Sequence, residues 1–149
     1  MDEIDRKLCE HLQADARLPV AVLARELALP VSSVRDRVRR LVETGVIEAF
    51  CARLADHAFD RAQVVFVLVD LSRESEDAAL AALERIDGLQ ELHHVAGPRS
   101  WLLKLRVRDV AHFAGVLEAE IKAAPGVERT ETLVVMESRV EHQHLPVTP

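Results

Sequence analysis

The chain has 149 residues, of which 49% are apolar, and a formal net charge of −6. This length holds one domain or two small ones with real hydrophobic cores. The longest unbroken apolar run, Val64 to Val69, is far too short to span a bilayer, and the N-terminus does not resemble a signal peptide. Cys9 and Cys51 lack metal-ligand spacing. We therefore expect a cytoplasmic protein without membrane segment, metal or cofactor.

The acidic charge is unevenly distributed along the chain. Residues 1–54 carry nine basic and nine acidic side chains, whereas residues 55–149 carry ten and sixteen. Between Arg35 and Arg40, four arginines accompany a single aspartate. Because exposed charges act within a Debye length of about 8–10 Å, this local excess can bind phosphates although the whole protein is acidic.

Three short helices are predicted in the N-terminal part of the chain. The apolar periodicity of residues 3–14 predicts the first, with Asp2 as its N-cap. Pro19 opens a second helix, because proline suits a first helical position, and Pro30 stands at the entry of the third. Only a tight turn at residues 28–30 separates the last two helices. This succession predicts a helix-turn-helix unit.

The third helix has one apolar and one polar face. Val34, Val38 and Leu41 recur at the spacing of one helical face, and Gly45 follows where a left-handed C-cap is expected. The polar face is either a solvated surface or a surface that contacts DNA. N-terminal residues of such helices reach base edges, whereas later ones suit phosphates. The base-edge candidates are Ser32, Ser33, Arg35 and Asp36, and the phosphate candidates are Arg39 and Arg40.

Two further predictions concern the N-terminal part of the chain and its end. Arg37 faces between the buried and exposed sides of the third helix, and we interpret it as a structural ion pair with Asp5 rather than a DNA contact. Residues 46–54 are extended and partly alternating, which favours a wing or a connecting strand. The polar residues 55–61 are the best domain boundary, and we interpret them as a hinge.

Strands and helices alternate beyond the hinge. Their order, βαββαβ, predicts a ferredoxin-like sandwich with helices on one face of the sheet only. The uncovered face favours a homodimer or a higher oligomer. The predicted strands are 63–71, 89–96, 101–108 and 127–137, and the predicted helices are 75–86 and 110–121.

Several stretches together carry a family resemblance. They are Met1–Leu8, Leu12–Arg17, Leu23-Ala24, Arg37–Leu41, Gly45–Ile47, Gly97, Trp101–Lys104, Pro125–Val127 and Thr130–Thr132. In this order and spacing they resemble the Lrp/AsnC (feast/famine) family over essentially the whole chain. The resemblance implies an α+β protein with four parts. These are a winged helix-turn-helix domain (1–54), a hinge (55–61), a ferredoxin-like, RAM-type effector-binding and oligomerisation domain (62–138) and a C-terminal tail (139–149).

The resemblance also implies a function. Family members are transcriptional regulators that bind double-stranded DNA and respond to small effectors, usually amino acids. We therefore expect a non-enzymatic regulator that forms a homodimer and assembles further into a tetramer or octamer.

The chain departs from the family pattern in the turn before the third predicted strand. The family has Gly-x-x-Asp-aromatic there, whereas this chain has Ser100 in place of the acid that lies near an effector's amino group. A loop that bears Arg99 and lacks a carboxylate favours an anion or keto acid over an amino acid, or no ligand at all. The effector-site candidates are Gly97, Pro98, Arg99, Ser100, Trp101, Thr130 and Thr132.

Each of these candidates has a structural alternative. Trp101 also suits a sheet or interface anchor, and strand propensity explains Thr130 and Thr132 equally well. His93 and His94 point to opposite faces of a strand, so they are not expected to share a metal ion.

Three departures concern the helix-turn-helix. Pro19 and Pro30 replace the usual capping serines, and Ala28 replaces a common turn glycine. Proline exchanges a side-chain cap for a preset φ angle.

Two other functions stay open at the level of sequence. The siroheme decarboxylases share the two-domain plan, and the chain resembles them to that extent, although it lacks a His and Arg cluster suited to a tetrapyrrole. An effector-sensing oligomeric adaptor with a vestigial helix-turn-helix is the other alternative. No catalytic motif was found.

Overall fold

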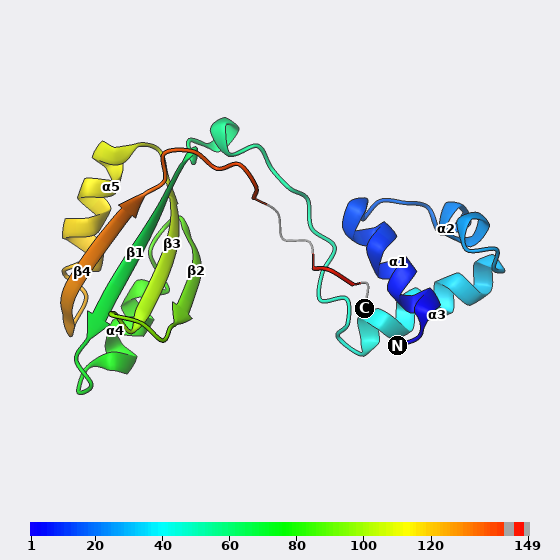
Figure 1. The fold of residues 1–149 in the computed structure, drawn as a ribbon, viewed down its shortest axis with the longest axis horizontal. Coiled ribbons are helices and arrows are strands. Elements are labelled where there is room, and N and C mark those ends of the chain that lie inside the picture. Colours follow the sequence, from blue (N-terminus) through cyan, green and yellow to red (C-terminus); the bar gives the residue numbers. More distant parts are fainter. Residues whose placement is uncertain (142–144, 148–149) are drawn as a thin grey trace. The chain divides into compact units, whose positions relative to one another are not determined.

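The computed structural model describes residues 1–141 and 145–147. These residues form two compact units (Figure 1). The first comprises residues 1–53 together with the described C-terminal residues from Val140 onward, and the second comprises residues 54–139. Within the described part of the chain, no helix is both long and apolar enough to cross a membrane.

The first unit packs three helices around a small apolar core. They are α1 (Glu3–Ala14), α2 (Val20–Glu26) and α3 (Val31–Glu43). As predicted, Asp2 caps α1: its carboxylate accepts the Asp5 backbone N–H at 2.8 Å, and the Asp5 carboxylate accepts the Asp2 N–H at 3.1 Å. The buried core consists of Leu8, Cys9, Leu23, Ala24, Val34 and Leu41.

Both α2 and α3 begin directly after a proline. Pro19 (φ −62°, ψ 138°) and Pro30 (φ −60°, ψ 141°) occupy the N-cap positions. The prediction that Pro19 is the first helical residue was wrong by one position, because its extended ψ keeps it outside the helix, and Pro30 lies at the entry of α3 as predicted. As expected, no side chain caps either helix. The fixed φ of proline replaces that hydrogen bond.

The turns beside α3 use the left-handed backbone region. Ala28, between α2 and α3, has φ 52°, where a Cβ atom is sterically unfavourable. The Leu29 N–H nevertheless donates to the Ala24 carbonyl at 2.9 Å, which closes the turn. Gly45 has φ 71° just after α3, as the C-cap prediction requires.

Residues 46–54 do not form the expected wing or connecting strand in the described structure. The Ile47 N–H donates to the Leu41 carbonyl at 3.0 Å. Farther on, the side chains of Phe50 and Leu54 are 52% and 60% exposed. A strand needs a neighbour that supplies ladder hydrogen bonds, and the described part of this single chain offers none there.

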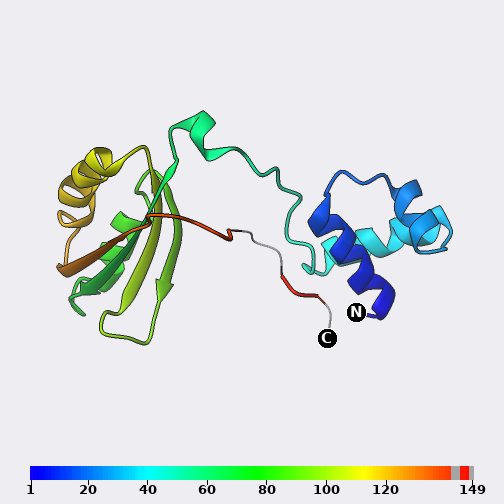
Figure 2. The same cartoon turned by 45° about the horizontal axis from the view of Figure 1, so that its top comes forward.

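The second unit alternates strands and helices along the chain. Its elements are η1 (Asp56–Phe59), β1 (Gln63–Leu71), α4 (Glu76–Leu83), β2 (Leu89–His94), β3 (Trp101–Val107), α5 (Val110–Val116), the π-helical η2 (Leu117–Ile121) and β4 (Val127–Val134). The strands form an antiparallel sheet of order β2-β3-β1-β4, as predicted for a ferredoxin-like fold. The helices pack on one face of this sheet, and α5 is visible there in yellow in Figure 2. The strands end up to three residues earlier than predicted.

The two faces of this sheet differ in burial. Val65, Val67 and Val69 of β1 are fully buried beneath the helices. The alternate residues Phe66 and Leu68 are only partly buried, on the face that no helix of the described chain covers. We call this surface the open face.

One arginine on the open face is unusually buried for a charged residue. The alternation of β3 places Arg106 on the polar side of its strand, yet this residue is only 7% exposed. Asp56 of η1 lies 2.8 Å from its guanidinium, and the Arg61 carbonyl accepts a hydrogen bond at 3.2 Å. The segment before β1 therefore covers this edge of the open face.

Candidate nucleic-acid interface and effector site

A buried carboxylate attaches α3 to α1. Asp5 is 1% exposed, and its Oδ1 accepts from Arg37 Nη1 at 2.8 Å, which confirms the predicted ion pair. Arg40 Nη2 donates to both Asp5 carboxylate oxygens, at 3.0 and 2.8 Å. Arg37 also lies 2.6 Å from Asp2. We call these four residues the Asp5 cluster.

The Asp5 cluster favours the charged form of each shifted group. Burial by itself would raise the pKa of Asp5, but hydrogen bonds from Arg37 and from the Asp2 backbone outweigh it, so the pKa is lowered. The pKa of Asp2 is lowered chiefly by the Asp5 backbone N–H and next by Arg37. Conversely, hydrogen bonds to Asp2 and Asp5 raise the pKa of Arg37.

The polar face of α3 contains the predicted DNA contacts. Ser32, Arg35, Asp36 and Arg39 are exposed there, whereas Ser33 is half-buried. In the described structure, Arg39 Nη2 lies 2.8 Å from Asp36 and its Nε 3.8 Å from Glu43, so this arginine is held along the helix surface.

Arg35 and Arg40 differ in how they are held. Arg35 makes no hydrogen bond or ion pair with any described residue, so its guanidinium is available to a ligand. Arg40, predicted to contact phosphates, is shared with Asp5, although its side chain remains 56% exposed. Sequence reasoning identified Arg37 as structural but missed the second arginine on the same carboxylate. One helical turn relates Arg37 to Arg40, which is the signal that could have found it.

The turn between β2 and β3 carries the second predicted site. The Val95 N–H donates to the Ser100 carbonyl at 2.8 Å, which closes the turn. Arg99 Nη1 donates to Asp70 at 2.8 Å, and the Ser100 N–H donates to the other Asp70 oxygen at 3.3 Å. Arg99 Nε lies 4.0 Å from the Glu131 carboxylate of β4. We call Asp70, Arg99 and Glu131 the Arg99 cluster.

The turn itself has no carboxylate, but the structure brings one to it from another strand. Asp70, at the end of β1, brings its carboxylate to Ser100, the position where the family pattern has an acid. Asp70 and Ser100 are thirty positions apart, and only the antiparallel pairing of β1 with β3 makes them neighbours. Arg99 lies between two carboxylates, and its buried Nε has no hydrogen-bond partner among the described residues.

The strand register divides the predicted effector residues between two faces of the sheet. Val69 is buried on the helix-covered face, and its two cross-strand partners are Trp101 and Thr130. Thr132 pairs with buried Val67 on that same face. Asp70 follows Val69 and belongs to the open face, with the rest of the Arg99 cluster.

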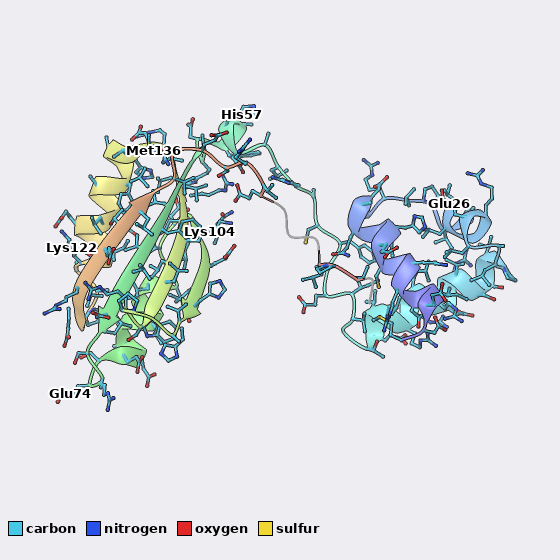
Figure 3. All side chains as sticks on the ribbon, viewed as in Figure 1. Glu26, His57, Glu74, Lys104, Lys122 and Met136 are labelled. Carbon is cyan, nitrogen blue, oxygen red and sulfur yellow. The ribbon has the colours of Figure 1, made fainter. Side chains whose placement is uncertain are left out.

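Trp101 has contacts of its own on the helix-covered side. Its Nε1 donates to Glu76 of α4 at 3.0 Å, and its ring lies 4.8 Å from the ring of His94. His93 instead pairs with Glu91, so the two histidines separate as predicted. Glu91 also binds Lys104, which is labelled in Figure 3, and this hydrogen bond chiefly lowers the pKa of Glu91. No group of three or more metal-ligating side chains converges within the described residues.

Comparisons with known proteins cover both units. Residues 1–48 match the family model for a winged helix-turn-helix DNA-binding domain, and residues 64–145 match that for the Lrp/AsnC ligand binding domain. A leucine-responsive regulatory protein of Salmonella typhimurium is 34% identical over 150 residues, which are 99% of this chain and 92% of that protein.

Solved structures with the same fold extend over nearly the whole chain. AsnC of E. coli matches with a TM-score of 0.91 at 25% identity, over 98% of this chain and 99% of that one. A feast or famine regulatory protein from M. tuberculosis, complexed with L-methionine, matches with a TM-score of 0.87 at 33% identity, over 97% and 99% of the two chains.

Proposed function

Because the chain belongs to the Lrp/AsnC family of transcriptional regulators, we propose that it binds specific double-stranded DNA sites through α3 and responds to an amino acid. The observation that carries this proposal is the difference between the contacts of the four arginines of α3. Arg37 and Arg40 attach the helix to α1, whereas Arg35 and Arg39 remain on its outer face. A helix fixed on one side with exposed cations on the other suits the major groove.

We assign different roles to the six predicted DNA contacts. Arg35, Ser32, Ser33 and Asp36 near the helix N-terminus are proposed to read base edges. Arg39 is proposed to exchange its exposed partners for a phosphate, at little cost because exposed ion pairs contribute at most about 1 kcal/mol. Arg40 is proposed to touch a phosphate only while it stays bound to Asp5.

A DNA titration tests this assignment. The probe is the duplex upstream of the protein's own coding sequence, followed by fluorescence anisotropy between about 50 and 200 mM salt. Arg35→Ala and Arg39→Ala should each weaken binding several-fold, and loss of a phosphate contact should reduce the salt slope by about 1. Arg85→Ala, an exposed arginine of the sheet unit, removes the same charge as a control. Equal binding by all three variants would contradict the proposal, and no binding by the wild type would favour the adaptor alternative.

We further propose that a second copy of the chain covers the open face of the sheet. Phe66, Leu68 and Leu102 are only partly buried there, and Leu133 is 51% exposed. A contiguous apolar surface of this kind is typical of an isologous interface. Sedimentation velocity of wild type and Leu133→Glu tests it: a shift toward monomer is expected, and an unchanged mass would contradict it. The wild-type mass also distinguishes dimer, tetramer and octamer.

The Arg99 cluster is our proposed effector site. A zwitterionic amino acid can place its carboxylate on Arg99 and its ammonium on Asp70, so the ligand replaces the ion pair that now joins these two groups. A keto acid offers no cation to the two carboxylates, and we therefore favour the amino acid. Gly97, Pro98 and Ser100 shape the turn, whereas we propose only an indirect role for Trp101, Thr130 and Thr132.

We assign no enzymatic activity to the chain, in line with its relatives, and we place it in the cytoplasm with its DNA. The siroheme-decarboxylase alternative gains no support from those relatives. Mixing the purified protein with a siroheme-type tetrapyrrole checks this: we expect an unchanged absorbance spectrum, and a shifted Soret band would contradict it.

A further inference from the structure

The described C-terminal residues pack against the DNA-binding unit. The Leu145 N–H donates to Gln13 Oε1 at 2.7 Å, and Gln13 Nε2 donates to the Leu145 carbonyl at 3.1 Å. One amide side chain on α1 thus satisfies both backbone groups of a single residue, as a neighbouring strand would. Val147 adds an apolar contact with the core of the unit.

The contact depends on the backbone of Leu145 rather than on its side chain. That side chain is 72% exposed, whereas Val147 is partly buried. Val147 is one of nine partly buried apolar residues that pack against the six buried core residues of the first unit.

The same segment is also attached to the sheet at its other end. The Val135 N–H, just after β4, donates to the Val64 carbonyl at 3.1 Å. Gln63 Nε2 donates to the carbonyls of Val64 and Val135 at 2.8 and 2.9 Å. The C-terminal segment therefore leaves the sheet beside the point where the linker enters β1.

We propose that the surface of α1 around Gln13 is a docking site for the C-terminal segment of the same chain. Leu145–Val147 acts there as a strap that ties the end of β4 to the DNA-binding unit. The chain then joins this unit to the sheet on both sides, before β1 and after β4. Two connections leave a tethered unit fewer orientations than one, which lowers the entropy lost when two such units bind two half-sites.

Hydrogen–deuterium exchange of the full chain tests the docking without any DNA. Leu145→Pro removes the donating N–H, whereas Leu145→Ala keeps it and changes only an exposed side chain. Val147→Asp places a charge in the apolar contact, and Val140→Asp places the same charge at a residue that is 75% exposed. Amides of β1 and β3 report whether each variant remains folded.

We expect about tenfold faster exchange at the C-terminal end of α1 in Leu145→Pro, in Val147→Asp and in a chain that ends at Glu141. Leu145→Ala and Val140→Asp should stay within about twofold of wild type. Equal exchange in all these proteins would overturn the proposal, whether or not the protein binds DNA.

Crosslinking identifies which copy supplies the strap. A Cys51→Ser chain that also carries Ala14→Cys and Leu145→Cys is treated with a short bis-maleimide, since Cys9 is buried and Gln13 keeps its hydrogen bonds to the Leu145 backbone. A crosslinked product of monomer size on a denaturing gel supports docking within one chain. A dimer-sized product would overturn that part of the proposal and assign the strap to a second copy.

The functional consequence rests on the proposed DNA binding and is measured separately. Removal of the strap should weaken binding to a duplex with two half-sites about tenfold and leave binding to a single half-site unchanged. An equal loss on both duplexes would show that the strap stabilises the DNA-binding unit without limiting its orientation.

Discussion

The Asp5 cluster and the Arg99 cluster are both built from carboxylates and arginines, but a carboxylate lies at the centre of the first and a guanidinium at the centre of the second. In the first, one carboxylate that is 1% exposed receives two arginines and a backbone N–H. In the second, one guanidinium lies between two carboxylates, and its buried Nε has no hydrogen-bond partner among the described residues. One cluster is saturated with hydrogen bonds, and the other is not.

We propose that this difference separates a structural role from a binding role. A buried ion whose hydrogen bonds are all satisfied loses stability when any partner is removed, so it fixes one arrangement of its helices. A charged group with a buried donor that makes no hydrogen bond can give up its present partners when a ligand offers acceptors for all of its donors. We therefore expect the Asp5 cluster to control stability and the Arg99 cluster to control affinity for the effector.

Asp5→Asn should have the largest effect on stability. The substitution keeps the size of the side chain but leaves Arg37 and Arg40 without their buried anion. We expect a loss of about 2–3 kcal/mol in the free energy of unfolding of the first unit, measured by urea denaturation. Asp2→Asn is the control, because Asp2 is 52% exposed and should matter less. If Asp5→Asn is as stable as wild type, the cluster has no structural role.

Acid should weaken the same unit. The pKa of Asp5 is lowered in the folded state, so the folded protein favours the ionised carboxylate more than the unfolded chain does. This stabilisation is fully present above the ordinary aspartate pKa of about 4, and it is lost as the pH falls through the lower folded value. Between about pH 5 and pH 2, wild type should lose more stability than Asp5→Asn. Parallel pH profiles for the two proteins would contradict this assignment.

Asp70→Asn should destabilise the protein less than Asp5→Asn and alter ligand binding. The Asp70 side chain is 25% exposed against 2% for Asp5, so solvent screens its ion pair with Arg99 more strongly. If an amino acid places its ammonium on Asp70, L-methionine should bind about tenfold more weakly to the variant in calorimetry, a loss of about 1.4 kcal/mol. The 2-oxo acid with the same side chain is the matched control ligand. Tighter binding of this 2-oxo acid to wild type would instead favour the keto acid interpretation.

The contrast between the clusters also shows what sequence reasoning can reach. Apolar periodicity placed the three helices of the first unit and the four strands of the second, because burial of one face dictates the spacing of residues such as Val34 and Leu41. It also identified Arg37, whose angle on the helix points toward α1. It could not place Asp70 beside Ser100, since that contact depends on strand pairing across thirty positions.

The sequence also did not reveal which charged side chains are buried. Arg106 alternates with apolar residues like any solvated strand residue, yet Asp56 from the preceding segment covers it. The docking of Leu145 depends on backbone groups that every residue possesses, so no side-chain pattern marks it. Contacts between distant segments, rather than local conformation, are what the sequence alone left undetermined.

Ala28→Gly should stabilise the first unit by about 0.5–1 kcal/mol. Ala28 has φ 52°, a left-handed conformation that costs alanine more than glycine. The extra backbone entropy of glycine in the unfolded chain removes part of this gain. Ala21→Gly, at an exposed helical position of α2, should instead destabilise the unit by about as much. Thermal unfolding of both variants measures these changes. If Ala28→Gly is more stable than wild type, the backbone at Ala28 is strained in the folded unit, although the hydrogen bonds of the Asp5 cluster in the same unit are satisfied.

Pro30→Ser should have the smallest effect on stability. It changes only the start of α3 and leaves the residues of the Asp5 cluster in place. Serine can accept a hydrogen bond from the first turn, which is worth about 1 kcal/mol at an N-cap. The variant also gives up the fixed φ of proline, so the unfolded chain gains about 0.4–1 kcal/mol of conformational freedom. Because these contributions oppose each other, we expect a change within about 0.5 kcal/mol of unfolding free energy. A larger loss in thermal melting would mean that the Pro30 ring, and not only the Asp5 cluster, holds α3 in place.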